Sequence, residues 1–211
     1  MELIHKTFDL IDRVTNSNYV VLRNIDLIES QQSSIENDID VLVPREFVGR
    51  LSTEAGSLGY DVYADRNRCL YGAESHTHFK HHDDVHFDIV TGLYYRSAED
   101  INTFFNVDIK LTKSMLDNKK EFNLNGGKMF VPSVDDELSH LVAHCIFDKR
   151  TVTDRYQKRI EELSEEMDDD NVKLLFDMMF YKVSDSIFKD VKNNNVDKIY
   201  TTYSTFIDYY E

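Results

Sequence analysis

Hydrophobic and polar residues near the N-terminus recur first with the period of a helix and then with that of strands. Apolar residues fall at helical spacing at four positions: Ile4, Phe8, Ile11 and Val14. They predict an amphipathic helix over residues 2–15. A run of β-forming residues predicts a buried strand over 19–23, and a second strand over 38–43 is closed by Pro44, which cannot donate to a strand ladder. The polar stretch between them, residues 29–37, is predicted to be a loop.

The middle of the chain continues this mixture of helix and strand. Residues 45–58 carry a helical pattern, and Gly59 follows at the place where a left-handed residue commonly ends a helix. Short segments rich in β-formers come next, over residues 60–64, 69–73, 76–80 and 85–90. The stretch Asn125-Gly126-Gly127, between two further β-forming runs, predicts a hairpin.

The pattern changes after Pro132. Ser133 can cap a helix whose first turn is acidic, and the remaining sequence is typical of helices broken near 168–171 and 193–195. We therefore predict an α+β fold. A mixed β-sheet flanked by helices occupies residues 1–131, and a helical C-terminal region over 132–211 is expected to pack on it.

Two aspartates begin the strand over 38–43. Because residues i and i+2 of a strand point the same way, Asp38 and Asp40 share one face while Ile39 faces the core. Two carboxylates this close repel each other unless a cation lies between them. Mg²⁺ suits such a pair, since it takes one or two carboxylates together with phosphate oxygens, and two such ions can clamp both oxygens of a nucleotidyl transfer.

A third aspartate lies inside a later apolar strand. Asp88 interrupts the β-forming segment 85–90, where an isolated aspartate is a poor strand residue. On a neighbouring strand it could complete a metal site with Asp38 and Asp40 and accept the proton of a hydroxyl acceptor. The alternative for all three acids is an ordinary solvated strand face.

These motifs resemble a known family. The strand and turn Tyr19–Asn24, the strand Asp38-Ile39-Asp40-Val41-Leu42-Val43 and the later strand with Asp88 are similar to the DNA polymerase β-type nucleotidyltransferase superfamily, in particular its small prokaryotic members of uncharacterised activity. The resemblance implies a nucleotidyltransferase-like mixed sheet and a helical C-terminal region. It also implies two Mg²⁺ ions, held by the three aspartates, that transfer a nucleoside monophosphate from a nucleoside triphosphate to a hydroxyl.

The chain departs from the family at one turn. Members carry a Gly-Gly or Gly-Ser turn whose backbone approaches the triphosphate closely, whereas this chain has Arg23-Asn24. Asn24 tolerates the left-handed backbone, and Arg23 could bind a phosphate through its guanidinium. The departure also motivates an alternative function, a catalytically inactive protein that binds nucleotide or a partner protein as in a toxin–antitoxin pair.

A histidine-rich stretch follows the predicted strand over 69–73. His76, His78 and Lys80 would share one face of a strand. One interpretation is a zinc or iron hydrolase built on these histidines, although no fixed zinc-ligand signature is present. The other is that His78 and Lys80 flank the active cleft and contact a substrate phosphate or the acceptor.

Two further cations are candidates for phosphate binding. Arg96 follows the strand of the third aspartate by a few residues, and Lys149 lies on the helix that begins after Ser133. The alternatives are a surface salt bridge for Arg96 and a favourable interaction with a helix C-terminus for Lys149.

Composition narrows the partners. The net charge of −15 argues against extensive, sequence-independent binding to nucleic acid, which relies on a basic surface. The acceptor could be a small molecule, a glycan or lipid precursor, a protein or an RNA end. No apolar run approaches the roughly 20 residues that span a bilayer, and no signal peptide is recognisable, so a cytoplasmic location is expected. Cys69 and Cys145 are interpreted as buried thiols. The aromatic residues near the C-terminus form either core or the surface of a homodimer.

Overall fold

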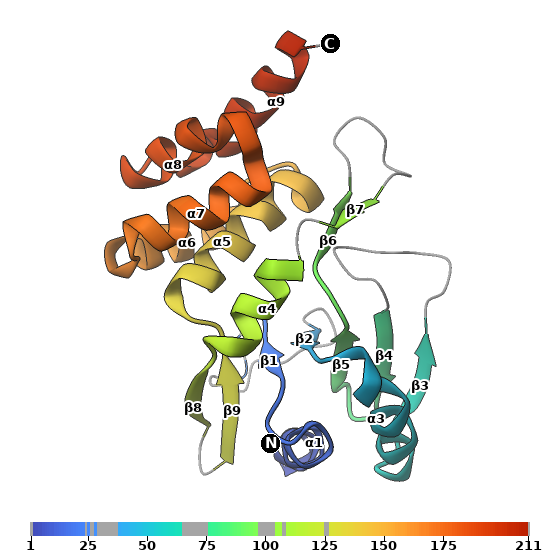
Figure 1. Ribbon diagram of the computed structural model, residues 1–211. Helices are drawn as coiled ribbons and strands as arrows, with labels where there is room; N and C mark the ends of the chain where they lie inside the picture. The colour runs from blue at the N-terminus through green and yellow to red at the C-terminus, as the bar shows by residue number, and fades with distance from the viewer. Residues whose placement is uncertain are drawn as a thin grey trace. The chain divides into compact units, whose positions relative to one another are not determined.

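The chain divides into two compact units in the computed structural model (Figure 1). Residues 2–23, 25, 28, 38–64, 76–96, 104–106, 109–124 and 127–210 are described. Unit one comprises Met1–Leu93 and Thr112–Pro132, and unit two comprises Tyr94–Leu111 and Ser133–Glu211. The segment 94–111, which the sequence analysis placed with the sheet, therefore belongs with the helical unit. Asn24 and the predicted loop 29–37 and strand 69–73 lie outside the described residues.

Unit one is built on a five-stranded sheet. Its strands follow the order β1 (Val20–Val21), β2 (Ile39–Leu42), β5 (His86–Val90), β4 (His76–Lys80) and β3 (Asp61–Ala64). Strand β2 pairs with β5 in parallel, and the other neighbours are antiparallel. The sheet is therefore mixed, and with the surrounding helices the prediction of an α+β fold is confirmed.

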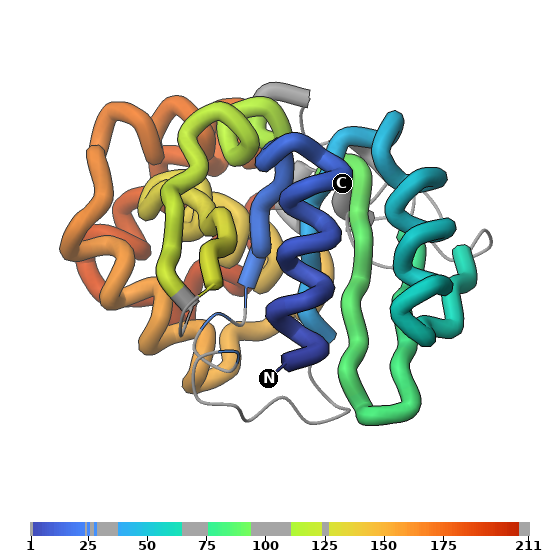
Figure 2. Tube along the Cα trace, turned by 90° about the horizontal axis from the view of Figure 1, so that it is seen from below, coloured from blue at the N-terminus to red at the C-terminus, as the bar shows by residue number. Residues whose placement is uncertain are grey.

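One face of this sheet is covered by two helices, α1 (Glu2–Thr15) and α3 (Arg45–Ser57), which lie next to each other (Figure 2). Apolar residues of both helices and of the strands form one buried cluster that includes Phe8, Ile11, Leu51, Ile39, Val41, Phe87 and Ile89. Each of these side chains contributes roughly 1.5–3 kcal/mol through its burial. Because side chains alternate along a strand, the residues between them project from the opposite face.

The predicted boundaries of these elements are largely confirmed. The helix over 2–15 is observed as predicted, and α3 ends one residue before its predicted end. Gly59 adopts φ 90°, the left-handed conformation expected after a helix. Strands β8 (Lys120–Leu124) and β9 (Gly127–Val131) form the predicted hairpin, with Leu124 paired to Gly127.

Three short elements were not predicted. Helix α4 (Ile109–Asp117) lies in the part of the sequence that carried no assignment, and strands β6 (Tyr94–Arg96) and β7 (Phe104–Asn106) form a separate two-stranded sheet. A strand of three residues is too short for its alternation to be recognised, and α4 shows only one apolar pair, Leu111 and Met115, at helical spacing.

Unit two is mainly helical, as predicted. Its helices are α5 (Val134–Ala143), η1 (His144–Lys149), α6 (Asp154–Glu166), α7 (Asp169–Phe180), η2 (Tyr181–Val183), α8 (Ser184–Lys192), η3 (Val196–Lys198) and α9 (Ile199–Tyr210). Ser133 caps α5 by accepting a hydrogen bond from the backbone N–H of Asp136, which confirms the predicted cap. Cys145 is a buried thiol as predicted, and Cys69 lies outside the described residues. None of the described helices is long and apolar enough to cross a membrane.

Tyr60 links α1 to the sheet. Its hydroxyl lies 2.7 Å from Thr7 Oγ1, and burial raises the pKa of Tyr60 to about 12. We expect Tyr60→Phe to lower the free energy of unfolding by about 1 kcal/mol at neutral pH, because one buried hydrogen bond is lost. The folded-state pKa is raised, so this stabilisation is complete below the unfolded value of about 10 and is lost as pH rises towards the folded value. The difference in free energy of unfolding between wild type and Tyr60→Phe should therefore become smaller above about pH 10.

Urea unfolding at neutral and alkaline pH measures this effect. Tyr181→Phe is the matched control, because Tyr181 is 72% exposed and the loss of its hydroxyl should change the free energy of unfolding little. If the free energies of unfolding of wild type and Tyr60→Phe differ by the same amount at both pH values, the raised pKa of Tyr60 is contradicted.

Candidate functional site

The face of the sheet opposite α1 and α3 is polar. Strand alternation places on it alternate residues of β2, β4 and β5 and the residue just before β2. They are Asp38, Asp40, His76, His78, Lys80, His86 and Asp88. Asp40 is paired in register with Asp88, and Asp88 with His78. These three residues therefore form a row across neighbouring strands about 4.8 Å apart.

The structure brings the three predicted acids together on this face. Asp40 and Asp88 are buried, with 3% and 6% of their surfaces exposed, and Asp38 is half-buried two residues before Asp40. Burial and the negative charges of Asp88 and Asp40 together raise the pKa of Asp38 above its ordinary value. The three carboxylates are thus close enough for their charges to interact.

Each acid also contacts a basic side chain of the same unit. Arg23 Nε donates to Asp40 Oδ2 at 2.6 Å. His78 Nδ1 lies 2.7 Å from Asp88 Oδ1, and His86 Nδ1 lies 3.2 Å from Asp38 Oδ1. The sequence predicts that Arg23 binds a phosphate and that His78 contacts a substrate phosphate or the acceptor, whereas in the structure both contact carboxylates. These contacts offset part of the repulsion among the acids.

His76 contacts the second carboxylate oxygen of Asp88. Its Nε2 lies 2.8 Å from Asp88 Oδ2. Burial alone would lower the pKa of His76, but the contact with Asp88 outweighs it and raises that pKa. Burial alone would raise the pKa of Asp88, but the two imidazoles outweigh it and hold that pKa below its ordinary value. Asp88 is therefore ionised at neutral pH, and one imidazole contacts each of its carboxylate oxygens.

Lys80 lies at the exposed edge of this face. Its Nζ is 5.4 Å from the centre of the Tyr63 ring on β3, and the Tyr63 ring stacks on His78 with ring centres 4.8 Å apart. Tyr63 thus restricts the orientation of His78. Lys80 is a solvent-accessible cation on the same face as the acids, as the sequence predicted.

Three other residues are predicted from the sequence to bind substrate: Asn24, Arg96 and Lys149. Asn24 is outside the described residues. Arg96 ends β6 and Lys149 ends η1, and both elements belong to unit two. Lys149 Nζ lies 3.6 Å from Asp148 Oδ2 of its own helix.

Two residues of the site have no part in the nucleotidyltransferase site that the sequence predicts. His76 enters only the zinc or iron hydrolase interpretation, and His86 enters neither. The signal for both was the spacing of two residues, from His78 on β4 and from Asp88 on β5, because such a spacing places side chains on one strand face.

The donor atoms suit two kinds of cation. The carboxylate oxygens of Asp38, Asp40 and Asp88 are the hard ligands that Mg²⁺ prefers, so the predicted metal fits the chemistry of these residues. A tighter group, with one nitrogen or oxygen from each residue and all three within 4.8 Å of one another, is formed by His76, His78 and Asp88. Within the described ranges a second group of this kind lies at the turn after β4, from His81, His82 and Asp83.

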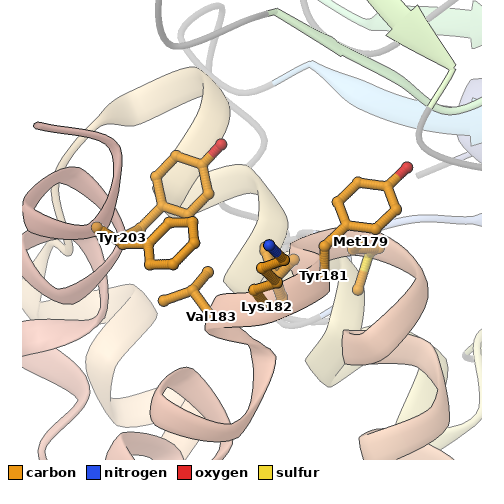
Figure 3. A pocket seen from close by; sticks show the side chains of 7 residues that line it. Met179, Tyr181, Lys182, Val183 and Tyr203 are labelled. Atoms are coloured by element: carbon orange, nitrogen blue, oxygen red, sulfur yellow. The ribbon is translucent and has the colours of Figure 1, made fainter. Parts of the chain in front are cut away.

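Unit two contains a cavity of about 400 Å³ (Figure 3). It is lined by Met179, Phe180, Tyr181, Lys182, Val183, Tyr203 and Phe206. Some of the C-terminal aromatic residues that were predicted as core or dimer surface thus line a cavity. No acid is among its described lining residues, so we place the candidate site on the sheet of unit one.

Comparison with known proteins adds no assignment. Neither the protein-family models nor the curated proteins searched contain a match to this chain. Function must therefore be argued from the chemistry of the site, since an α+β fold hosts many activities.

Proposed function

We propose that the protein is a magnesium-dependent nucleotidyltransferase that moves a nucleoside monophosphate from a nucleoside triphosphate to a hydroxyl. The observation that carries this proposal is the pairing of Asp40 with Asp88 on neighbouring parallel strands, with Asp38 on the same face. The order of elements also supports it, because a helix, a strand, an Asp-x-Asp strand and a later strand with a third acid follow one another as in the family that the sequence resembles.

The three acids would hold the magnesium. Bound magnesium supplies neutralisation of phosphate charge and alignment of the reacting oxygens. Asp88 would accept the proton of the acceptor hydroxyl, because it is ionised at neutral pH. The imidazoles that contact its two oxygens hold the carboxylate in place, and they also make it a weaker base. His76 and His78 act in this scheme as positioning residues.

Two cations could bind the triphosphate. The exposed ammonium of Lys80 lies on the same face as the acids. Arg23 donates to Asp40, and a phosphate would compete with that carboxylate for the guanidinium. The negative charge of the whole chain favours a small or protein acceptor over a long nucleic acid. A supply of nucleoside triphosphate would place the reaction in the cytoplasm.

Transfer of label tests the proposal directly. The protein is incubated with Mg²⁺, a cell extract and each of four nucleoside triphosphates labelled at the α-phosphate. We expect label to appear on an acceptor, with release of pyrophosphate, for at least one nucleotide, and EDTA to abolish both. The labelled species identifies donor and acceptor together. Neither label transfer nor pyrophosphate release with any of the four would contradict the proposal.

A second candidate function follows from the ion pair between Arg23 and Asp40. Arg23 occupies a carboxylate oxygen that would otherwise bind metal, which favours a catalytically inactive protein that binds nucleotide or a partner protein of the toxin–antitoxin type. This candidate predicts a nucleotide-dependent rise in melting temperature, or capture of a partner, without release of pyrophosphate. The labelled-nucleotide experiment separates the two functions.

A further inference from the structure

We propose that His76, His78 and Asp88 form a binding site for a transition-metal ion of the zinc type, distinct in its chemistry from the magnesium set. The site shares Asp88 with the proposed function but does not depend on it. Imidazole nitrogens favour zinc and similar first-row ions, whereas Mg²⁺ favours oxygen ligands alone. Two nitrogens and one carboxylate oxygen are the ligands found in several zinc enzymes.

The geometry of two paired strands carries the proposal. His76 and His78 are two residues apart on β4 and so point from one face, and Asp88 lies directly opposite His78 on β5. One ligand atom from each residue falls within 4.8 Å of the other two. Because all three residues sit in a hydrogen-bonded sheet, the backbone holds the ligand set in place. Three protein ligands would leave a coordination position for water or substrate.

The imidazole of His76 provides an independent observation. The residue is 94% buried, since only 6% of its surface is exposed, and its Nδ1 has no hydrogen-bond partner in the described part of the chain. Its Nε2 lies 2.8 Å from Asp88 Oδ2 in a geometry that makes an ion pair but not a hydrogen bond. Buried polar atoms are nearly always hydrogen-bonded in folded proteins, and a metal ion bound by His76 and Asp88 would satisfy a nitrogen of this ring.

The surroundings favour a cation at this place. Asp40 is the strand neighbour of Asp88, and the charge of Asp38 also acts on His76. The positive charges of Lys80 and Arg23 oppose the negative charges of these aspartates. Solvent screens the exposed Lys80, and the charge of Arg23 is paired with Asp40. The Tyr63 ring, stacked on His78, limits rotation of that ligand.

The second histidine–aspartate group serves as a comparison. His81 Nδ1 accepts a hydrogen bond from the backbone N–H of Asp83 at 3.1 Å. The side chains of His82 and Asp83 are 78% and 64% exposed. Exposed ligands on a turn are not held in one arrangement, so this group supplies a matched control rather than a site.

Titration with Co²⁺ tests the proposal on the full chain after treatment with a chelator. Co²⁺ reports nitrogen and oxygen coordination through its visible absorption. We expect one equivalent to bind and Zn²⁺ to displace it. His76→Gln and His78→Gln should each weaken Co²⁺ binding by about 100-fold, since changes even outside the ligand set cost metal sites 10–100-fold. His82→Gln should leave the affinity unchanged.

The test of this metal site can be separated from the test of nucleotidyl transfer. Asp38→Asn removes a proposed magnesium ligand that is not part of this group, so it should abolish transfer of label and weaken Co²⁺ binding by about tenfold at most, the smallest cost expected of a change outside the ligand set. Co²⁺ affinity that is unchanged in His78→Gln, or Co²⁺ that is displaced by an equal concentration of Mg²⁺, would overturn the site. Circular dichroism verifies folding, and His78→Gln decides the matter if His76→Gln fails to fold.

Discussion

Replacement of Asp88 by asparagine is expected to lower kcat for nucleotidyl transfer about 1,000-fold or more. Asparagine keeps the shape of the side chain but removes the charge that would bind metal and the oxygen that would accept the acceptor's proton. Both functions converge on this residue because it lies between Asp40 on one neighbouring strand and His78 on the other. The substitution therefore removes a metal ligand and the proposed base in one step.

The measurement is pyrophosphate release at saturating Mg²⁺ and nucleotide. Asp9→Asn is the control, because Asp9 is exposed on α1, the helix that covers the opposite face of the same sheet. It undergoes the same chemical change away from the acids, and its kcat should stay within twofold of wild type, roughly the change expected of a neutral surface substitution. Wild-type kcat in Asp88→Asn would exclude Asp88 from catalysis.

The alternation of side chains along each strand explains which features of this site could be predicted from the sequence. The alternation of strands placed Asp38 and Asp40 on one face, and the same rule placed His76, His78 and Lys80 together, because the direction of a side chain depends only on its own strand. The observed faces of β2 and β4 agree with this reading. The polar face of the sheet was thus largely readable from the sequence.

Pairing between distant strands could not be predicted from local patterns, and only the family resemblance implied that Asp88 lies beside Asp40. Asp40 meets Asp88 because β2 and β5 associate in parallel in one register, and a shift of one residue would turn Asp88 to the opposite face. That register depends on the packing of both strands against α1 and α3, which no short segment contains. The contacts of His76 and His78 with Asp88 follow from the register of β4 in the same way.

The role of Arg23 was unpredictable for a related reason. The backbone N–H of Leu22 donates to the carbonyl of Asp40 at 2.9 Å, which brings the next residue, Arg23, beside that aspartate. From the sequence alone the guanidinium could equally have faced a phosphate. The pairing of β1 with β2 decides between these positions, and it leaves Arg23 on Asp40.

Replacement of Arg23 by methionine is expected to lower the free energy of unfolding by about 3 kcal/mol in the absence of divalent metal. The side chains of Arg23 and Asp40 are 16% and 4% exposed, so the variant leaves a buried carboxylate without its cation. Arg50→Met is the matched control. Arg50 forms an exposed pair with Glu54, which should contribute about 0.5 kcal/mol or less. Urea unfolding in EDTA measures both.

Magnesium turns this variant into a test of the site. If Asp40 belongs to a magnesium site, the ion replaces the lost guanidinium, and Mg²⁺ at about 100 times its Kd would restore about 2.7 kcal/mol. Wild type should gain less, because Arg23 competes with the metal for Asp40 Oδ2. The double variant Arg23→Met/Asp40→Asn should lose less stability than Arg23→Met alone, since no buried charge is left unpaired, and should gain little from Mg²⁺. Equal gains in wild type, Arg23→Met and the double variant would show that Asp40 does not bind magnesium. The ion pair would then be a permanent part of the fold, which favours the inactive, nucleotide-binding or partner-binding function.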